Sequence, residues 1–280
     1  MILIADSGST KTEWLLIQEN GNKSYITPGY NPYFVDSTFV INSIQKELFP
    51  FINENLIKEI YFYGAGCMHD QKKQIISEAL EELFKNATIE VHHDLLGAAR
   101  ALFGRDEGIV CILGTGSNSC YFNGNDIEEN VISLGYIFGD EGSGVHMGKN
   151  LLKLFMKDEL SSILKQKVLE KYNITVFDIL DNVYKKPFPN RYIASFSYFL
   201  AENIEHKEIQ NIVKNCFRDF FNYQLKKYSA FGKVNLSATG SICSVFENEL
   251  KDVANENFTQ FININKSPIQ GLFKYHSQNN

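Results

Sequence analysis

The chain opens with the stretch that decides its fold, Met1-Ile-Leu-Ile-Ala-Asp-Ser-Gly-Ser-Thr-Lys-Thr-Glu-Trp-Leu-Leu-Ile17. Residues 2–5 form a continuous apolar run, which is typical of a strand buried on both faces, and residues 14–17 form a second run. A short polar loop separates the two runs. Because the Asn-Gly-Asn turn at residues 20–22 ends the second run too soon for a helix, the pattern predicts two antiparallel strands joined by this loop.

The loop has the composition of a phosphate site without the spacing of the common phosphate motifs. A Walker loop needs G-x-x-x-x-G-K-[ST] before a helix, a dinucleotide fingerprint needs G-x-G-x-x-G, and neither spacing occurs here. The loop contains Ser7, Gly8, Ser9, Thr10 and Lys11. Its backbone N–H groups and its lysine can bind phosphate oxygens, while Asp6 can hold a hydrated Mg²⁺. Taken alone, the loop is more typical of an ordinary polar hairpin turn.

A second copy of this arrangement changes the interpretation. Residues 109–113 form another buried apolar run, followed by Gly114-Thr-Gly-Ser-Asn-Ser119 and by a short apolar run at residues 120–122. In both places a strand is followed by a loop rich in glycine and hydroxyl side chains and then by another strand. This repetition predicts a duplicated domain with two phosphate-binding hairpins.

Composition limits the class of protein. A length of 280 residues is enough for two domains, and 44% apolar with 21% charged residues is typical of a soluble globular chain. A net charge of −6 without a basic cluster argues against nucleic acid as a partner. The sequence shows no signal-peptide pattern and no run of roughly eighteen apolar residues, so we expect a cytoplasmic protein without a membrane partner.

The five cysteines are scattered, and no C-x-x-C pair occurs among them. They are Cys67, Cys111, Cys120, Cys216 and Cys243. Two of them fall in predicted core strands. The pattern therefore predicts reduced, structural thiols.

The rest of the chain is predicted to repeat one order of elements. The first half continues with strand 23–26, loop 27–32, a helix near 39–49, strand 59–63, a helix capped by Asp70 that runs to about residue 85, strand 88–91 and a helix opening at Asp94. The second half continues with a strand near 131–134, a glycine-rich loop at 135–144, about ninety mostly helical residues, strands 234–238 and 258–264, and a helix from Ser267-Pro268. Aligning the two halves places Asp94 opposite Pro268, so only the first copy carries the carboxylate.

With two such halves, the chain resembles the actin, hexokinase and heat-shock ATPase superfamily. Within it, the chain is most similar to the N-acetylglucosamine kinase group of the BadF/BadG/BcrA/BcrD ATPase family, over essentially its whole length. The specific motifs are Leu113-Gly-Thr-Gly-Ser-Asn-Ser119, which resembles the second phosphate motif, and Gly139-Asp-Glu-Gly-Ser143. Asp6-Ser-Gly-Ser-Thr-Lys-Thr12 resembles the first phosphate motif, and Ser237-Ala-Thr-Gly-Ser-Ile-Cys-Ser244 the adenosine motif.

The resemblance implies an α/β fold of two ribonuclease H-like (actin-like ATPase) domains, with duplicated mixed sheets and a central nucleotide cleft. It implies ATP and Mg²⁺ as cofactors and an amino sugar as acceptor, with N-acetylglucosamine converted to its 6-phosphate. The implied ATP-binding residues are Ser9, Thr10, Lys11, Thr115, Gly116, Ser117, Gly240, Ser241 and Ser244. The implied sugar-binding residues are Asn31, Asp94, Asn118, Gly135 and Asp140, and Asp6 is expected to hold Mg²⁺ through water.

The expected boundaries follow the duplication. An N-terminal actin-like ATPase domain at 1–108 would carry the sugar and the catalytic base, and a C-terminal one at 109–266 would carry a helical insertion. Residues 267–280 would form a terminal helix that packs back on the N-terminal domain.

Phosphoryl transfer to a sugar hydroxyl needs neutralised phosphates, in-line positioning and a carboxylate that orients and deprotonates the acceptor. We expect Asp94 to be this catalytic base, and its alternative role is that of a plain helix N-cap. Asp140 and Glu141 have the alternative of solvated loop acids. His92 and His93 have no third ligand at useful spacing, so we expect structural histidines rather than a metal site.

Other members of the wider superfamily fit the sequence less well. A sugar kinase of the repressor type would carry a cluster of closely spaced cysteines for zinc, which this sequence lacks. An ATPase of the dehydratase-activator type needs cysteines at a dimer seam for an iron–sulfur cluster, whereas Cys111 and Cys120 fall in or beside a core hairpin. A non-catalytic sugar or nucleotide sensor would have no need of Asp94. The acceptor stays open among N-acetylglucosamine, glucosamine, N-acetylmannosamine and N-acetylmuramic acid, and a homodimer also stays open.

Overall fold

The computed structural model describes residues 1–277 and divides the chain into two compact units. The first unit comprises Met1–Val110, Phe122–Ile127 and the chain from Ser267 onward. The second unit comprises Cys111–Tyr121 and Glu128–Lys266. Each unit is described by itself below.

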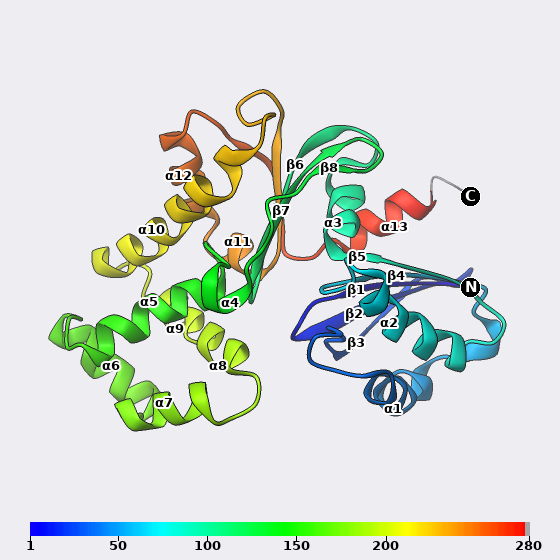
Figure 1. Cartoon of the computed structure of the whole chain (residues 1–280), viewed down its shortest axis with the longest axis horizontal. Coiled ribbons are helices and arrows are strands. Elements are labelled where there is room, and N and C mark those ends of the chain that lie inside the picture. Colours follow the sequence, from blue (N-terminus) through cyan, green and yellow to red (C-terminus); the bar gives the residue numbers. More distant parts are fainter. Residues whose placement is uncertain (278–280) are drawn as a thin grey trace. The chain divides into compact units, whose positions relative to one another are not determined.

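The first unit contains a five-stranded mixed sheet with the order β3-β2-β1-β4-β5 (Figure 1). Its strands are β1 (Ile2–Ser7), β2 (Lys11–Ile17), β3 (Lys23–Pro28), β4 (Glu59–Gly64) and β5 (Thr88–His93). The first three strands are antiparallel neighbours, whereas β4 pairs parallel with β1 and β5 pairs parallel with β4. The predicted opening hairpin and its third strand are confirmed.

Alternate side chains of the opening hairpin enter two different cores, because successive side chains of a strand point to opposite faces. Leu3, Ala5 and Trp14 belong to one buried cluster, which α1 (Ser37–Glu47) and α2 (Asp70–Leu83) complete. Ile4 and Leu15 belong to another cluster, which α13 (Ile269–Ser277) completes. Helices therefore cover both faces of this sheet, as the continuous apolar runs predict (Figure 1).

Glycines permit two close contacts of the helices in the first unit. A β-carbon at Gly97 of α3 (Asp94–Phe103) would lie 2.7 Å from Cγ of Tyr63. A β-carbon at Gly271 of α13 would lie 2.2 Å from the carbonyl oxygen of Ala101 in α3. Either substitution would therefore push a helix away from its neighbour.

The second sheet has the order β10-β9-β6-β7-β8. Its strands are β6 (Glu107–Leu113), β7 (Ser117–Asn123), β8 (Ile127–Glu129), β9 (Leu236–Thr239) and β10 (Phe261–Asn265), and β9 pairs parallel with β10. In chain order the arrangement is the same as in the first sheet. Three opening strands lie side by side, and the two later strands extend the sheet from the other edge of the first of them. The predicted duplicated α/β architecture is therefore confirmed.

Most helices of the second unit lie between β8 and β9, as the predicted helical insertion. They are α4 (Gly135–Phe138), α5 (Gly144–Met156), α6 (Ser162–Tyr172), α7 (Val176–Tyr184), α8 (Pro189–Ser195), α9 (Ser197–Glu202) and α10 (Lys207–Tyr223). The helices α11 (Ser241–Val245) and α12 (Glu247–Glu256) lie between β9 and β10. Among residues 1–277 no helix is long and apolar enough to span a membrane.

The structure corrects three details of the predicted elements. The third strand of the second half is Ile127–Glu129 and not 131–134, where Ile132 and Leu134 are exposed and lack the burial that their apolar character suggested. The last strand begins at Phe261 rather than 258, because Phe258 is exposed and has a left-handed backbone. The N-cap of α2 is His69, so Asp70 is the first helical residue and not the cap.

Candidate active site

The loop at residues 6–11, predicted to bind phosphate and called the first phosphate loop below, is a tight turn. Its hydroxyls divide between the interior and the surface. The N–H of Gly8 donates to the carbonyl oxygen of Lys11 at 2.9 Å and closes the hairpin. Ser7 is fully buried, its Oγ lies 2.7 Å from Oγ1 of Thr12, and it accepts a hydrogen bond from the N–H of Tyr30. Ser7 therefore holds the loop in place, while Thr10 and Lys11 are exposed at its tip.

The loop at residues 27–32, which carries the expected sugar-binding residue Asn31 and is called the predicted sugar loop here, packs directly on this turn. Gly29 donates its N–H to the carbonyl oxygen of Thr10 at 3.1 Å, and a β-carbon at Gly29 would lie 2.3 Å from the carbonyl oxygen of Gly8. The side-chain amide of Asn31 donates to Oγ of Ser9 at 2.9 Å, and its Oδ1 accepts from the N–H of Tyr33 at 3.0 Å. Asn31 thus joins the predicted sugar loop to the first phosphate loop, which the sequence did not indicate.

Acidic side chains gather at the end of β1. Burial raises the pKa of Asp6 to about 7. The carboxylates of Asp94 and Glu13 contribute to this rise in pKa, whereas the Lys11 ammonium opposes it. A divalent cation beside Asp6 would remove the cost of its negative charge, so the residues fit the predicted Mg²⁺. Residues 1–277 contain no group of three or more His, Cys, Asp and Glu that could hold a metal ion.

Asp94 is the first residue of α3, and one of its two carboxylate oxygens contacts neighbouring residues. Its Oδ1 accepts from the N–H of Leu95 and lies 2.9 Å from Nδ1 of His93. Burial disfavours the charged imidazole of His93, but pairing with Asp94 outweighs it, so the pKa of His93 lies above its ordinary value. The N-cap of α3 is His93, so the alternative of Asp94 as a plain N-cap is wrong. Within the described chain, Oδ2 of Asp94 makes no hydrogen bond and is available for a ligand.

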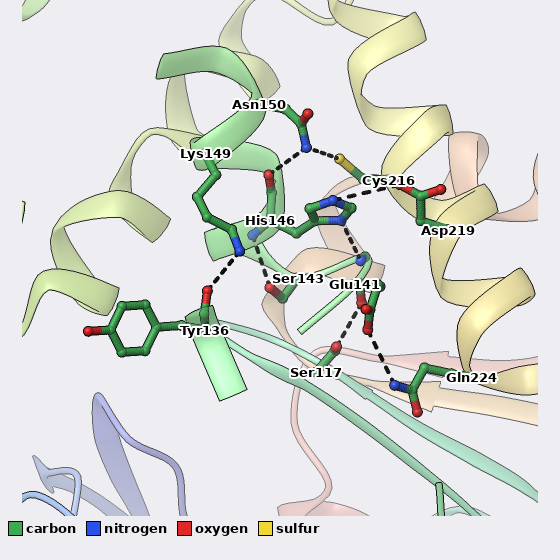
Figure 2. Close-up of polar contacts among 11 residues, drawn as sticks. Ser117, Tyr136, Glu141, Ser143, His146, Lys149, Asn150, Cys216, Asp219 and Gln224 are labelled. Carbon is green, nitrogen blue, oxygen red and sulfur yellow. Dashed lines mark hydrogen bonds and ion pairs between the residues drawn. The ribbon is translucent and has the colours of Figure 1, made fainter. Parts of the chain in front are cut away.

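The loop at residues 114–119, predicted to bind phosphate and called the second phosphate loop below, is joined to the start of α5 by backbone hydrogen bonds. The N–H of Gly144 donates to the carbonyl oxygen of Gly114 at 2.9 Å, and that of Val145 donates to Thr115 at 3.0 Å. In addition, Oγ of Ser117 donates to the carbonyl oxygen of Glu141 at 2.7 Å (Figure 2). The loop and the motif at 139–143 therefore form one hydrogen-bonded body, although they are far apart in sequence.

Asp140 lies in this body with an unusual backbone. Its φ is +58°, in the left-handed region that non-glycine residues rarely adopt. Its Oδ1 accepts from the N–H of Ser117 at 3.3 Å and from Oγ of Ser133 at 3.2 Å. Burial raises the pKa of Asp140, while these two hydrogen bonds lower it. Its Oδ2 has no hydrogen bond within the described chain and is available for a ligand.

The other predicted sugar residues of the second unit lie near Asp140 or are held by neighbours. Gly135 donates its N–H to Oγ of Ser133 at 3.4 Å, so Ser133 connects Gly135 to Asp140. Nothing lies within 4 Å of a β-carbon placed on Gly135. Oδ1 of Asn118 accepts from the N–H of Ser119 at 3.0 Å and from the amide of Asn130 at 3.3 Å.

The predicted adenosine turn follows β9, the strand beside β6. Gly240 has a φ of +129°, and a β-carbon there would lie 2.2 Å from the carbonyl oxygen of Leu113. Only glycine fits this close approach to the strand that leads into the second phosphate loop. Ser241 is exposed at the start of α11, and the N–H of Ser244 donates to the carbonyl oxygen of Gly240 at 3.3 Å.

Three residues that the sequence did not single out hold the site of the second unit. Ser133 binds Asp140, as described, while His146 and Lys149 of α5 face the motif at 139–143 and the turn of α4 (Figure 2). Nδ1 of His146 accepts from the N–H of Gly142 at 3.1 Å, and Nζ of Lys149 donates to the carbonyl oxygen of Tyr136 at 2.7 Å. The spacing of Ser143 and His146, an N-cap and its third helical residue, was the available signal for the histidine.

Comparison with known families gives one match that spans most of the chain. The model of the BadF/BadG/BcrA/BcrD ATPase family matches residues 5–272.

Among solved structures, a candidate N-acetylglucosamine kinase from Porphyromonas gingivalis is 40% identical to this chain, with a TM-score of 0.95. The match covers 100% of this chain and 99% of that one. N-acetyl-D-glucosamine kinase of Dictyostelium discoideum is 25% identical over 249 residues, which are 79% of this chain and 78% of that protein. N-acetylmuramic acid/N-acetylglucosamine kinase of Clostridium acetobutylicum is 27% identical over 164 residues, which cover 56% of this chain and only 54% of that protein.

Proposed function

The chain belongs to the BadF/BadG/BcrA/BcrD ATPase family, and from this premise we propose that it is an ATP-dependent kinase that phosphorylates N-acetylglucosamine on its 6-hydroxyl. The named relatives support the kinase activity and the acetylated amino sugar. The choice of the 6-hydroxyl rests on the family resemblance of the sequence.

The observation that carries the proposal is the state of Asp94. One carboxylate oxygen is fixed by Leu95 and His93, and the other has no hydrogen bond within the described chain. A carboxylate held in this way can accept the proton of a sugar hydroxyl as that oxygen attacks the γ-phosphorus of ATP. The N-terminus of α3 places a positive partial charge beside this carboxylate.

The phosphates of ATP are assigned to the two hairpin loops. In the first loop we assign Ser9, Thr10 and Lys11, and in the second Thr115, Gly116 and Ser117. Backbone N–H groups and a lysine neutralise the charge that develops on the transferred group, which is the main requirement of phosphoryl transfer. Adenosine is assigned to Gly240, Ser241 and Ser244, in the turn that joins β9 to α11.

Mg²⁺ is assigned to Asp6, through water. When bound, the ion neutralises phosphate oxygens of ATP. Within the protein, Asp6 supplies a carboxylate whose negative charge is disfavoured by burial and by Asp94 and Glu13. Asp6 therefore gains a partner of opposite charge when the ion binds.

The sugar is assigned to Asn31, Asn118, Gly135 and Asp140 together with Asp94. Asp140 contributes a free carboxylate oxygen, which can accept a hydrogen bond from a ring hydroxyl. Gly135 leaves open space where a side chain would otherwise stand. N-acetylmuramic acid stays an alternative acceptor because one relative is named for both sugars.

Two alternatives to a sugar kinase fit the structure less well. A dehydratase-activator ATPase would need accessible cysteines for a cluster, but Cys111 and Cys120 are both fully buried. A sensor without turnover would give no reason for the free Asp94 oxygen beside the acidic group of Asp6.

The proposal also covers the setting of the enzyme. We assign the catalytic base and part of the acceptor site to the domain at 1–108, and the rest of the acceptor site with most of the nucleotide-binding residues to the domain at 109–266. A cytoplasmic location fits a consumer of ATP. A homodimer remains part of the proposal to be measured by light scattering.

The direct experiment measures ATP consumption against a panel of hexoses and amino sugars, with product identified by phosphorus NMR. We expect turnover with N-acetylglucosamine, a product phosphorylated on the 6-hydroxyl, and loss of that turnover in Asp94→Asn. Turnover with no sugar of the panel, from a folded protein that binds ATP, would contradict the kinase proposal and favour the sensor.

A further inference from the structure

The peptide group that joins Glu141 to Gly142 in the second unit is hydrogen-bonded by side chains at both of its ends. Figure 2 shows Ser117, Glu141 and His146 of this arrangement. Oγ of Ser117 donates to the carbonyl oxygen of Glu141 at 2.7 Å. The N–H of Gly142 donates to Nδ1 of His146 at 3.1 Å. Because the carbonyl and the N–H belong to one rigid plane, the two bonds together fix the rotation of this peptide.

The helix start places His146 for this contact. Ser143 is the N-cap of α5, and its Oγ accepts from the N–H of His146 at 3.2 Å. The His146 side chain reaches back to a free N–H before the helix, as the Glu or Gln of a capping box does. Glycine is required at position 142, because a β-carbon there would lie 2.9 Å from Cβ of Phe220 on α10.

The contact defines the protonation state of His146. A ring nitrogen that accepts a hydrogen bond carries no proton, so the proton lies on Nε2. This nitrogen faces Oδ2 of Asp219 on α10 at 3.7 Å. Burial lowers the pKa of His146 from its ordinary value, and Lys149 on α5 acts in the same direction. Asp219 and Glu141, on α10 and the loop, raise the pKa by a smaller amount.

We propose that His146 is a positioning residue for the acceptor sugar, because its neutral ring holds the Glu141–Gly142 peptide and thereby the preceding Asp140 carboxylate in the orientation that binds a sugar hydroxyl. This inference rests on the proposed sugar kinase function. The left-handed backbone of Asp140, with φ of +58°, persists only where the surrounding structure holds it.

The proposal makes acceptor binding sensitive to pH through a residue that does not touch the sugar. An imidazolium would present an N–H to the N–H of Gly142, so protonation removes the hydrogen bond and releases the peptide. The KM for the sugar is therefore expected to rise as the pH falls. Asp140 adds its own part to this rise when its carboxylate is protonated, so variants are needed to separate the two.

Two substitutions of His146 separate the hydrogen bond from the bulk of the ring. In His146→Asn, the amide oxygen stands as many bonds from the backbone as Nδ1, and it accepts a hydrogen bond without titrating. His146→Leu fills similar space but leaves the N–H of Gly142 without an acceptor. His206→Asn is the matched control, because His206 lies at the start of α10 beside Lys167 and Glu205, away from the motif at 139–143.

The test measures kcat and the KM for N-acetylglucosamine from about pH 8 to about pH 5.5, the range in which histidine titrates. We expect His146→Leu to raise the sugar KM about tenfold at neutral pH, since a buried donor is left unpaired, with a smaller change in kcat. His146→Asn should keep a low KM and shift the acid-side rise to lower pH, and His206→Asn should behave as the unmodified enzyme. ¹⁵N NMR of histidine-labelled protein should show His146 protonated on Nε2 alone at neutral pH.

The inference fails if His146→Leu, still folded, keeps the KM and pH profile of the unmodified enzyme, or if His146→Asn leaves the acid-side rise in place. A proton on Nδ1 of His146 at neutral pH would also overturn it. If the unmodified enzyme phosphorylates no sugar, the proposed function fails instead, while the NMR measurement still reports on the hydrogen bond itself.

Discussion

Gly116 of the second phosphate loop and Asp140 stand in contact: a β-carbon at Gly116 would lie 2.9 Å from Oδ2 of Asp140. The neighbouring N–H of Ser117 donates to Oδ1 of the same carboxylate. A loop assigned to ATP phosphates therefore shapes the carboxylate assigned to the sugar. Substitutions in either one are expected to affect both ligands.

The first prediction follows from this contact. Gly116→Val should raise the KM for N-acetylglucosamine as well as that for ATP, because the new side chain displaces the Asp140 carboxylate. Steady-state kinetics with each substrate varied in turn would measure both. Gly114→Ala is the steric control, because no atom lies within 4 Å of a β-carbon there. If Gly116→Val raises only the KM for ATP, the Asp140 carboxylate can move aside without weakening sugar binding, and the prediction is wrong.

The second prediction concerns the base. Asp94→Asn should fold normally and bind ATP, but lose roughly 10²–10⁴ in turnover, the usual contribution of a general base. Asn can still accept the N–H of Leu95, so the thermal midpoint should hardly change. Asp140→Asn is the comparison, and it should retain more turnover. Turnover near that of the unmodified enzyme in Asp94→Asn, at saturating sugar and ATP, would leave the mechanism without its base.

The third prediction concerns the backbone of Asp140. Asp140→Ala should raise the sugar KM by about tenfold or more, since ligand hydroxyls and the Ser117 N–H lose their acceptor. It should also lower stability, because alanine tolerates a φ of +58° less well than Asp or Asn. Asp140→Asn should lose sugar affinity with a smaller loss of stability. Steady-state kinetics with varied sugar and urea unfolding would measure the two effects, and equal stability losses in both variants would contradict the backbone argument.

The fourth prediction concerns the terminal helix and pH. Nε2 of His276 lies 2.9 Å from the hydroxyl of Tyr63, the ring stacks on Tyr61, and burial lowers the pKa of His276 to about 4. The unfolded chain binds a proton at His276 near pH 6.5, whereas the folded chain accepts it only near pH 4. The folded state therefore keeps its full stability above about pH 6.5 and loses stability as the pH falls toward 4.

His276→Phe keeps the stacking and removes the titration. In urea unfolding at a series of pH values, the unmodified protein should lose more stability between about pH 6.5 and about pH 4 than this variant does. If the free energy of unfolding depends on pH in the same way for both proteins, His276 has the same pKa in the folded and unfolded states, which contradicts the prediction.

The sequence by itself determined the features that depend on neighbours along the chain. The apolar runs on both sides of the loop at residues 6–11 predicted the opening hairpin, since buried strands need continuous apolar side chains. The second run and loop at 109–119 predicted the duplicated sheet. The motif at 139–143 and the boundary between β5 and α3 likewise drew attention to Asp140 and Asp94.

Only the tertiary structure decided which polar atoms of these residues are free. The hydrogen bonds that fix Oδ1 of Asp140 come from Ser117 and Ser133, and the one that fixes Gly142 comes from His146. The strand predicted at 131–134 failed for a related reason, because Ile132 and Leu134 stay exposed in the fold although they are apolar. Burial and hydrogen-bond partners depend on segments that meet only after the chain folds, and local patterning carries no record of them.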